Sequence, residues 1–278
     1  MRSSVPVRPM SVPMRTDVVP AGEPPSGTSS RAKVVCGVDG CRLGWVVARL
    51  AQAPDAGVQV SVQLCVRPAL VDIVSGAERV FIDMPMGLAE TGERPVDRQL
   101  RALLGRQRSS VFSPPIRACL SATTYAAALA LQREREGRGF SIQAWNLMPG
   151  IRLLDEALRL EPMRVGCWLE SHPEWVFRGW MQQVGTDPDT LEPKKSEHGR
   201  RQREQLLVQR LPEVEEAATG CAEGWAGCRR SQAGVDDLLD ALALAVSAWE
   251  SLTGGLEVLG GEDDGAGIPM RVVRGRRR

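Results

Sequence analysis

Four aspartates lie where an apolar run stops or an apolar helix begins: Asp39 in VVCGVDG, Asp83 in RVFIDMP, and Asp237 and Asp240 in VDDLLDALALAV. Carboxylates gathered at the ends of buried elements repel one another and lose hydration, so a fold tolerates them mainly when a divalent cation neutralises them. A two-metal phosphoryl-transfer site needs several carboxylates that hold ions roughly 4 Å apart. The four aspartates therefore predict an Mg²⁺ or Mn²⁺ site that acts on phosphate esters.

The first two aspartates also have explanations without metal. Asp39 precedes Gly40 between two apolar runs, and Asp-Gly in that setting is a strong signal for a hairpin turn. Asp83 follows an apolar stretch and precedes Met84 and Pro85, where a carboxylate commonly caps the next segment. Neither residue identifies a metal site by itself.

The aspartates of the predicted last helix are more informative. Asp237 and Asp240 are three residues apart and share one helix face, and the other positions are almost all Leu, Ala and Val. The face could be a solvated stripe near the helix N-terminus. A helix this apolar should pack against a sheet, however, which would bring Asp240 close to buried surface. Glu170 ends another apolar run and is either a further site carboxylate or a strand end that faces water.

The composition indicates an ordinary globular protein with 278 residues, 43% hydrophobic and 25% charged. Its seven cysteines are an odd number without metal-like pairing, which is typical of reduced thiols in a cytoplasmic protein. The nearest pair, Cys221 and Cys228, is too widely spaced for a zinc knuckle. No apolar run approaches the roughly 18 residues of a membrane span, and no secretion signal is evident. We therefore expect a cytoplasmic protein that does not bind membranes.

The patterning divides the chain into a disordered leader over 1–33, a domain over 34–255 and a flexible basic tail over 256–278. The leader is rich in Pro, Ser, Gly and Thr, and the tail ends in RVVRGRRR. The domain should begin with three antiparallel strands, followed by an apolar parallel strand over 79–83 and a strand at VGCWLE. A capping box at Ser171 and Glu174 predicts that a helix begins there. Further helices are expected over 90–112, 123–137, 151–160, 194–211 and 236–252, with a helical insertion near 90–160.

These elements predict an α/β fold, a mixed five-stranded sheet flanked by helices. The order of strands is that of the ribonuclease H-like fold, which places carboxylates on its first strand, its fourth strand and a late helix.

Six blocks of the chain carry a resemblance to a known family: GVDGCRLGWV, VFIDMPMGL, LGRQRSSVFSPPIR, ESHPEWVF, KKSEHGRRQR and DDLLDALALA. In this order, over about Val34 to Trp249, they resemble the family of predicted ribonuclease H-like nucleases known as domain of unknown function 429. The resemblance implies Asp39, Asp83, Asp237 and Asp240 as metal ligands, with Glu170 as a further candidate. It also implies a homodimer, because the similar Holliday-junction resolvases work as dimers.

Basic residues indicate a phosphate-rich partner. Residues 94–117 hold six arginines against one aspartate, and a second basic set follows from Lys194 onward. Most of these side chains could simply be solvated. The best candidates for contacts to nucleic acid phosphates are Arg106, Ser110, Arg117 and Lys195.

The sequence therefore predicts a metal-dependent nuclease with a two-metal carboxylate site. One alternative is a non-catalytic module of the same fold that binds nucleic acid or protein. A second is a phosphotransferase or ATPase of the actin and sugar-kinase type, although such proteins pair two domains of this kind.

Overall fold

The structure is a computed structural model that describes residues 18–19, 32–220 and 232–277. Its centre is a five-stranded sheet in the order β4-β3-β2-β5-β6. The β2–β3 and β3–β4 pairs are antiparallel, whereas the β2–β5 and β5–β6 pairs are parallel. The expected mixed five-stranded α/β sheet is thus confirmed. Its strands are β2 (Lys33–Gly40), β3 (Gly44–Gln52), β4 (Gln59–Val66), β5 (Arg79–Asp83) and β6 (Trp168–Glu170).

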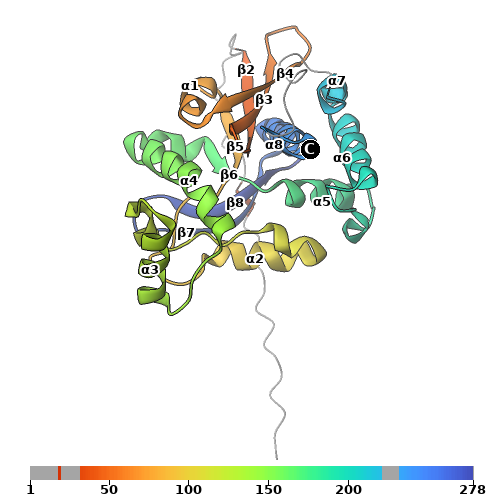
Figure 1. The fold of residues 1–278 in the computed structure, drawn as a ribbon. Helices are drawn as coiled ribbons and strands as arrows, with labels where there is room; N and C mark the ends of the chain where they lie inside the picture. Colours follow the sequence, from red (N-terminus) through yellow and green to blue (C-terminus); the bar gives the residue numbers. More distant parts are fainter. Residues whose placement is uncertain (1–17, 20–31, 221–231, 278) are drawn as a thin grey trace, which may run out of the picture.

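Helices cover both faces of this sheet (Figure 1). One face packs against α5, α6, α7 and α8, and the other packs against α1, α3 and α4. None of the helices in the described ranges is both long and apolar enough to cross a membrane. The helices are α1 (Leu70–Ile73), α2 (Pro95–Leu104), α3 (Tyr125–Glu136), α4 (Ile142–Leu160), α5 (Pro173–Gln183), α6 (Glu197–Arg210), α7 (Glu215–Ala218) and α8 (Val235–Gly254).

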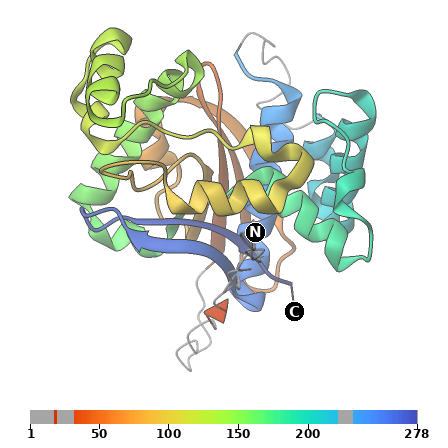
Figure 2. The same ribbon diagram turned by 90° about the horizontal axis from the view of Figure 1, so that it is seen from below.

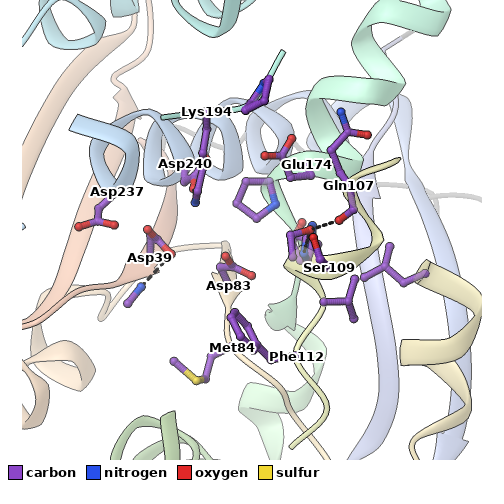
Figure 3. Close-up of a pocket in the computed structure, with 18 of the residues that line it drawn as sticks. Asp39, Asp83, Met84, Gln107, Ser109, Phe112, Glu174, Lys194, Asp237 and Asp240 are labelled. Atoms are coloured by element: carbon purple, nitrogen blue, oxygen red, sulfur yellow. Dashed lines mark hydrogen bonds and ion pairs between the residues drawn. The ribbon is translucent and has the colours of Figure 1, made fainter. Parts of the chain in front are cut away.

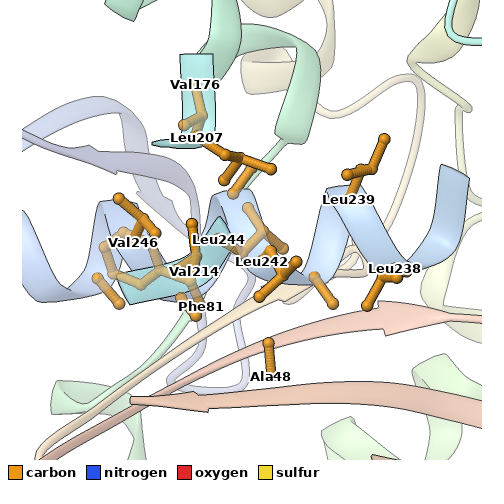
Figure 4. Close-up of a cluster of buried hydrophobic side chains, with 14 of the residues drawn as sticks. Ala48, Phe81, Val176, Leu207, Val214, Leu238, Leu239, Leu242, Leu244 and Val246 are labelled. Carbon is orange, nitrogen blue, oxygen red and sulfur yellow. The ribbon is translucent and has the colours of Figure 1, made fainter. Parts of the chain in front are cut away.

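Helix α8 lies directly on the middle of the sheet. Its Leu238 and Leu242 are fully buried, and Figure 4 shows them between the helix and the strand that carries Ala48. The helix crosses β2 at Gly37, where an added Cβ would lie 2.1 Å from the carbonyl oxygen of Ala241. Only glycine permits this approach. The close crossing holds the first turns of α8 against the ends of β2 and β5.

The pleat of β2 decides which residues face α8. Side chains two residues apart point to the same face of a sheet. Val35 belongs to the core beneath α8, and Cys36 and Val38 belong to the core on the opposite face. Gly37 and Asp39 therefore share the face of Val35. The strand thus places the Asp39 carboxylate on the α8 side of the sheet, near the carboxyl end of β2.

The expected flexible tail over 256–278 is wrong for residues 256–275. They form β7 (Leu256–Asp263) and β8 (Pro269–Gly275), which join β1 (Val18–Val19) in a second sheet of order β1-β7-β8. Figure 2 shows the β7–β8 hairpin in dark blue beside α2. Val272 and Val273 are fully buried on opposite faces of β8, where they pack into two separate cores although arginines flank them. Apart from Val18–Val19, Ala32 and Lys33, the expected leader lies outside the described residues.

Several local expectations can be compared with the structure. The predicted helix over 123–137 is confirmed as α3, and the Thr124 hydroxyl accepts a hydrogen bond from the amide of Ala127. The capping box at Ser171 is wrong, because the Ser171 hydroxyl donates to the carbonyl of Val273, 2.6 Å away. Helix α4 begins at Ile142 rather than at Ile151. Cys221 and Cys228 lie outside the described residues.

Candidate functional site

Three of the predicted carboxylates meet at one edge of the central sheet. Asp39 and Asp83 are paired residues on the parallel strands β2 and β5, so their side chains lie beside each other on the α8 face. Asp240 approaches from the second turn of α8 (Figure 3). Asp39 is 6% exposed and Asp240 is 1% exposed, which excludes a water-facing stripe for Asp240. Three elements that are distant in sequence therefore bring carboxylates into one buried region.

The metal-free explanations of these residues can now be separated. The hairpin turn is formed by Cys41, Arg42 and Leu43, and the Cys41 amide donates to the Gly44 carbonyl at 3.0 Å. Asp39 is therefore the penultimate residue of β2, and the turn interpretation is wrong. Its carboxylate accepts a hydrogen bond from the adjacent Gly40 amide at 2.9 Å.

Asp237 caps the N-terminus of α8 and also lies beside the other aspartates. Its carboxylate accepts a hydrogen bond from the amide of Gly234 at 2.8 Å, which is one half of a capping box at the start of α8. It is half-buried and lies at the rim of the carboxylate group, as Figure 3 shows. Asp237 thus has a role at the helix N-terminus, and a role in the site is compatible with it.

Lys194, in the segment before α6, provides the positive charge of this region. Its Nζ lies 2.5 Å from Oδ2 of Asp240. Burial alone would lower the pKa of the ammonium group, but the charges of Asp240 and Asp39 outweigh burial and raise it. The adjacent Lys195 was the lysine expected from the sequence to bind substrate. The lysine that contacts the aspartates is Lys194, and nothing in the KK pair distinguishes the two.

Burial makes the carboxylates hard to ionise together. The pKa of Asp39 lies well above its usual value because the side chain is desolvated, and because Asp83 and Asp240 repel its charge. Burial likewise raises the pKa of Asp83 to about 6, against the opposing effect of Lys194. Burial also raises the pKa of Asp240, and its Oδ1 has no hydrogen-bond partner in the described structure. If all three aspartates were ionised, the site would carry more negative charge than Lys194 can neutralise.

These carboxylates do not form a ready metal site. Among the residues that are described, no three Asp, Glu, His or Cys side chains are arranged to hold one ion. The Lys194 ammonium group contacts Asp240, where a cation would otherwise bind. Asp39, Asp83 and Asp240 are the residues that could hold a metal, and such binding would require Lys194 to move aside. The metal therefore stays a prediction.

Glu170 is not part of the aspartate group. It pairs with Ile82 across β5 and β6, so it points to the sheet face opposite to Asp83. There its Oε2 lies 2.5 Å from Arg94 Nη2 and accepts a hydrogen bond from the Met86 amide at 2.7 Å. Burial raises the pKa of Glu170 to about 7, and Arg94 opposes this rise. Glu170 therefore anchors the loop after β5 through a buried ion pair.

A cavity of about 680 Å³ opens above the aspartates. Of the residues expected to bind substrate, Arg106, Ser110 and Lys195 line it. Arg117 does not, and this expectation is corrected: its guanidinium group forms ion pairs with Asp155, at 3.0 Å, and with Asp264. Both carboxylates come from segments distant in sequence, so no local pattern marked Arg117 as structural.

The cavity also contains residues that the sequence analysis did not select. Phe112 lines it with 48% of its surface exposed. His172 lines it too, with Nε2 3.4 Å from the Ser110 hydroxyl and with no partner for Nδ1 in the part of the chain described. Glu174 is instead occupied, because both of its oxygens accept hydrogen bonds from Arg203 at 2.8 Å. The only sequence signal for Phe112 and His172 is their place in the blocks LGRQRSSVFSPPIR and ESHPEWVF.

Comparison with known proteins assigns the chain to a family. A family model described as "Protein of unknown function (DUF429)" matches residues 37–265. This stretch includes the four aspartates and Lys194. No curated protein and no solved structure matches the chain, so the comparisons attach no activity to it.

Proposed function

The chain belongs to the family described as Protein of unknown function (DUF429), and from this premise and its own site we propose that it is a metal-dependent nuclease. The observation that carries the proposal is the meeting of Asp39, Asp83 and Asp240 at the floor of one cavity. Two buried carboxylates and a half-buried one, with a single lysine, are a costly arrangement for stability alone. Clusters of this kind are typical of functional sites.

The architecture supports the proposal. The sheet order β4-β3-β2-β5-β6, with three antiparallel strands and two parallel ones, is the order expected of a ribonuclease H-like fold. Its first and fourth strands carry Asp39 and Asp83, and its late helix carries Asp237 and Asp240. A fold alone does not define a reaction, so the functional proposal depends on the residues of the site.

The donor set fits a hard divalent cation. Its atoms are carboxylate oxygens, which Mg²⁺ and Mn²⁺ prefer, and Oδ1 of Asp240 is buried with no hydrogen-bond partner among the described residues. Asp39, Asp83 and Asp240 would hold the ion, with Asp237 at the rim. When bound, a divalent cation supplies charge neutralisation and lowers the pKa of a water. The two-metal form of the site remains part of this proposal.

The residues of the chain would position the substrate. Lys194 and Lys195 bring positive charge to the cavity, and Arg106 and Ser110 also line it. These groups suit a phosphodiester anion. Hydrolysis joins the oxygen of one water to phosphorus and breaks one P–O bond to a sugar. The leaving sugar gains a hydroxyl group, and the second proton of the water goes to the phosphate monoester or to solvent.

The direct test is cleavage of end-labelled nucleic acids in Mg²⁺ or Mn²⁺. Single-stranded, duplex, hybrid and junction substrates would be compared on one gel. We expect cleavage of at least one substrate, and its loss when EDTA removes the metal. Purified, folded protein that cleaves none of them with either ion would contradict the proposal.

A non-catalytic module of the same fold is the second candidate. It is favoured by the contact between Lys194 and Asp240, which gives the carboxylates a cation from the chain itself. Such a module would bind nucleic acid with a steep salt dependence and cleave nothing. The phosphotransferase alternative gains no support, because the described residues contain one five-stranded sheet rather than a pair of such domains. A homodimer remains a prediction from the resemblance alone.

Exposed basic residues at the cavity should control the salt dependence of binding. We expect Lys195→Ala and Arg106→Ala each to weaken binding of a labelled oligonucleotide and to reduce the slope of log K against log salt by roughly one. Fluorescence anisotropy at several salt concentrations measures the slope. Arg138→Ala is the matched control, because Arg138 is exposed and does not line the cavity. An equal slope in all four proteins would exclude phosphate contacts by these two residues.

A further inference from the structure

The position of the aspartates limits the shape of the substrate. Asp39 and Asp240 are buried at the floor of the cavity, not on an open surface. The cavity of about 680 Å³ has the size of a small-molecule pocket. A duplex carries its phosphates on a rigid cylinder and keeps its bases stacked inside, so it cannot bring a phosphate to such a floor without unpairing. A flexible single strand can do so.

The part of the cavity beside Asp83 offers an apolar surface for a base. Phe112 is a large apolar residue that is half exposed, and Figure 3 shows it with Met84 on the Asp83 side of the cavity. Exposed aromatic side chains in nucleic-acid sites stack on unpaired bases, whatever the sequence. His172 also lines this cavity, and its buried Nδ1 has no hydrogen-bond partner among the described residues.

A second cavity continues the path on the other side of the aspartates. It measures about 540 Å³ and shares Gly40, Met84, Leu147 and Asp237 with the first cavity. Arg42 and Arg67 line it, and neither forms an ion pair with any described residue. The N-terminus of α8 also opens here at Gly234. Two arginines that have no ion pair among the described residues, beside a helix N-terminus, favour binding of a phosphate group.

We propose that this chain acts on an unpaired nucleotide strand, a deeper statement that rests on the proposed nuclease function. One base stacks on Phe112 in the first cavity, and the diester to be cleaved lies at the aspartates. The strand then continues past Arg42 and Arg67 in the second cavity. Duplexes and intact junctions are excluded as direct substrates because their phosphates remain outside the cavity.

The first test measures binding in EDTA, where no cleavage occurs, so that its result does not depend on activity. The probe is a fluorescein-labelled single-stranded oligonucleotide, compared with a blunt duplex of the same sequence. We expect the single strand to bind at least about tenfold more tightly, and Phe112→Ala to weaken its binding roughly tenfold. Ile142→Ala is the matched control, since Ile142 is 47% exposed and lies outside both cavities. Duplex binding as tight as single-strand binding, or no effect of Phe112→Ala, overturns the inference.

The second test separates a strand from a small nucleotide. The double variant Arg42→Ala/Arg67→Ala should weaken binding of the oligonucleotide severalfold and leave a dinucleotide unaffected. If the dinucleotide competes as well as the oligonucleotide in the unaltered protein, the path past the arginines is wrong.

Cleavage data keep this inference distinct from the nuclease proposal. Metal-dependent cleavage of duplex as fast as of single strand would overturn the inference and leave the nuclease proposal standing. A protein that binds single strands through Phe112 and cleaves nothing would contradict the nuclease proposal and keep the single-strand site.

Discussion

Replacing Asp39 with asparagine is expected to reduce metal-dependent cleavage at least about 100-fold without unfolding the protein. Asp39 lies between Asp83 on the neighbouring strand and Asp240 on α8, and both repel its charge. Asparagine keeps the shape of the side chain and its carbonyl oxygen, so the hydrogen bond from the Gly40 amide can persist. It removes one negative charge that a divalent cation would need.

The same variant should lose activity without losing stability. Without metal, the variant has less repulsion among buried carboxylates, so its melting temperature in EDTA should equal or exceed that of the unaltered protein. Adding Mg²⁺ or Mn²⁺ should raise the melting temperature of the variant by less than that of the unaltered protein, because the variant binds the cation less tightly.

Thermal melts and cleavage rates would be measured on the same preparations. Asp72→Asn is the control, because Asp72 is exposed on α1 and far from the cavity in the fold. A clean Asp39→Asn protein that cleaves at the original rate would remove the carboxylate mechanism. A large fall in its melting temperature in EDTA would show that Asp39 is structural.

Replacing Lys194 with methionine should destabilise the metal-free protein and increase its response to metal. The ammonium group contacts Asp240, and the pKa values of Asp83 and Asp240 are held down by it against the effect of burial. Loss of one partner of a buried ion pair costs about 3–5 kcal/mol. The Lys194 side chain is 34% exposed, so solvent screening should reduce the cost to about 2 kcal/mol.

A divalent cation and the Lys194 ammonium group compete for the same oxygens. We therefore expect Mg²⁺ or Mn²⁺ to bind more tightly to Lys194→Met than to the unaltered protein, and to raise its melting temperature by more. Titration calorimetry with the metal alone measures the affinity, and urea unfolding in EDTA measures the stability.

Lys195→Met is the matched control for this experiment. Lys195 is the adjacent residue, lines the same cavity and has no ion pair in the described ranges. Equal metal affinity and equal stability in the two variants would show that Lys194 neither stabilises the aspartates nor competes with a cation. The result would then favour an ordinary solvated lysine at this position.

The sequence determined the main layers of the fold because they depend on local patterns. Apolar runs of strand length predicted β2, β3 and β5, and the apolar helix with Asp237 and Asp240 predicted α8. The buried pair Val272 and Val273 was also visible in the sequence, but the surrounding arginines led to the wrong expectation of a flexible tail. Charge describes how a segment is solvated when it is isolated, whereas packing against α8 decides whether it is ordered.

Only the tertiary structure decided which of the candidate residues come together in the site. The sequence determined that Asp39, Asp83 and Asp240 stand at the ends of apolar elements, and strand register then placed the first two side by side. The same register turned Glu170 to the opposite face, toward Arg94, and a distant Asp264 engaged Arg117. Lys194, rather than Lys195, reached Asp240. Each of these outcomes depends on which face a side chain takes and on partners far away in the chain. Residue type and spacing do not encode either one locally.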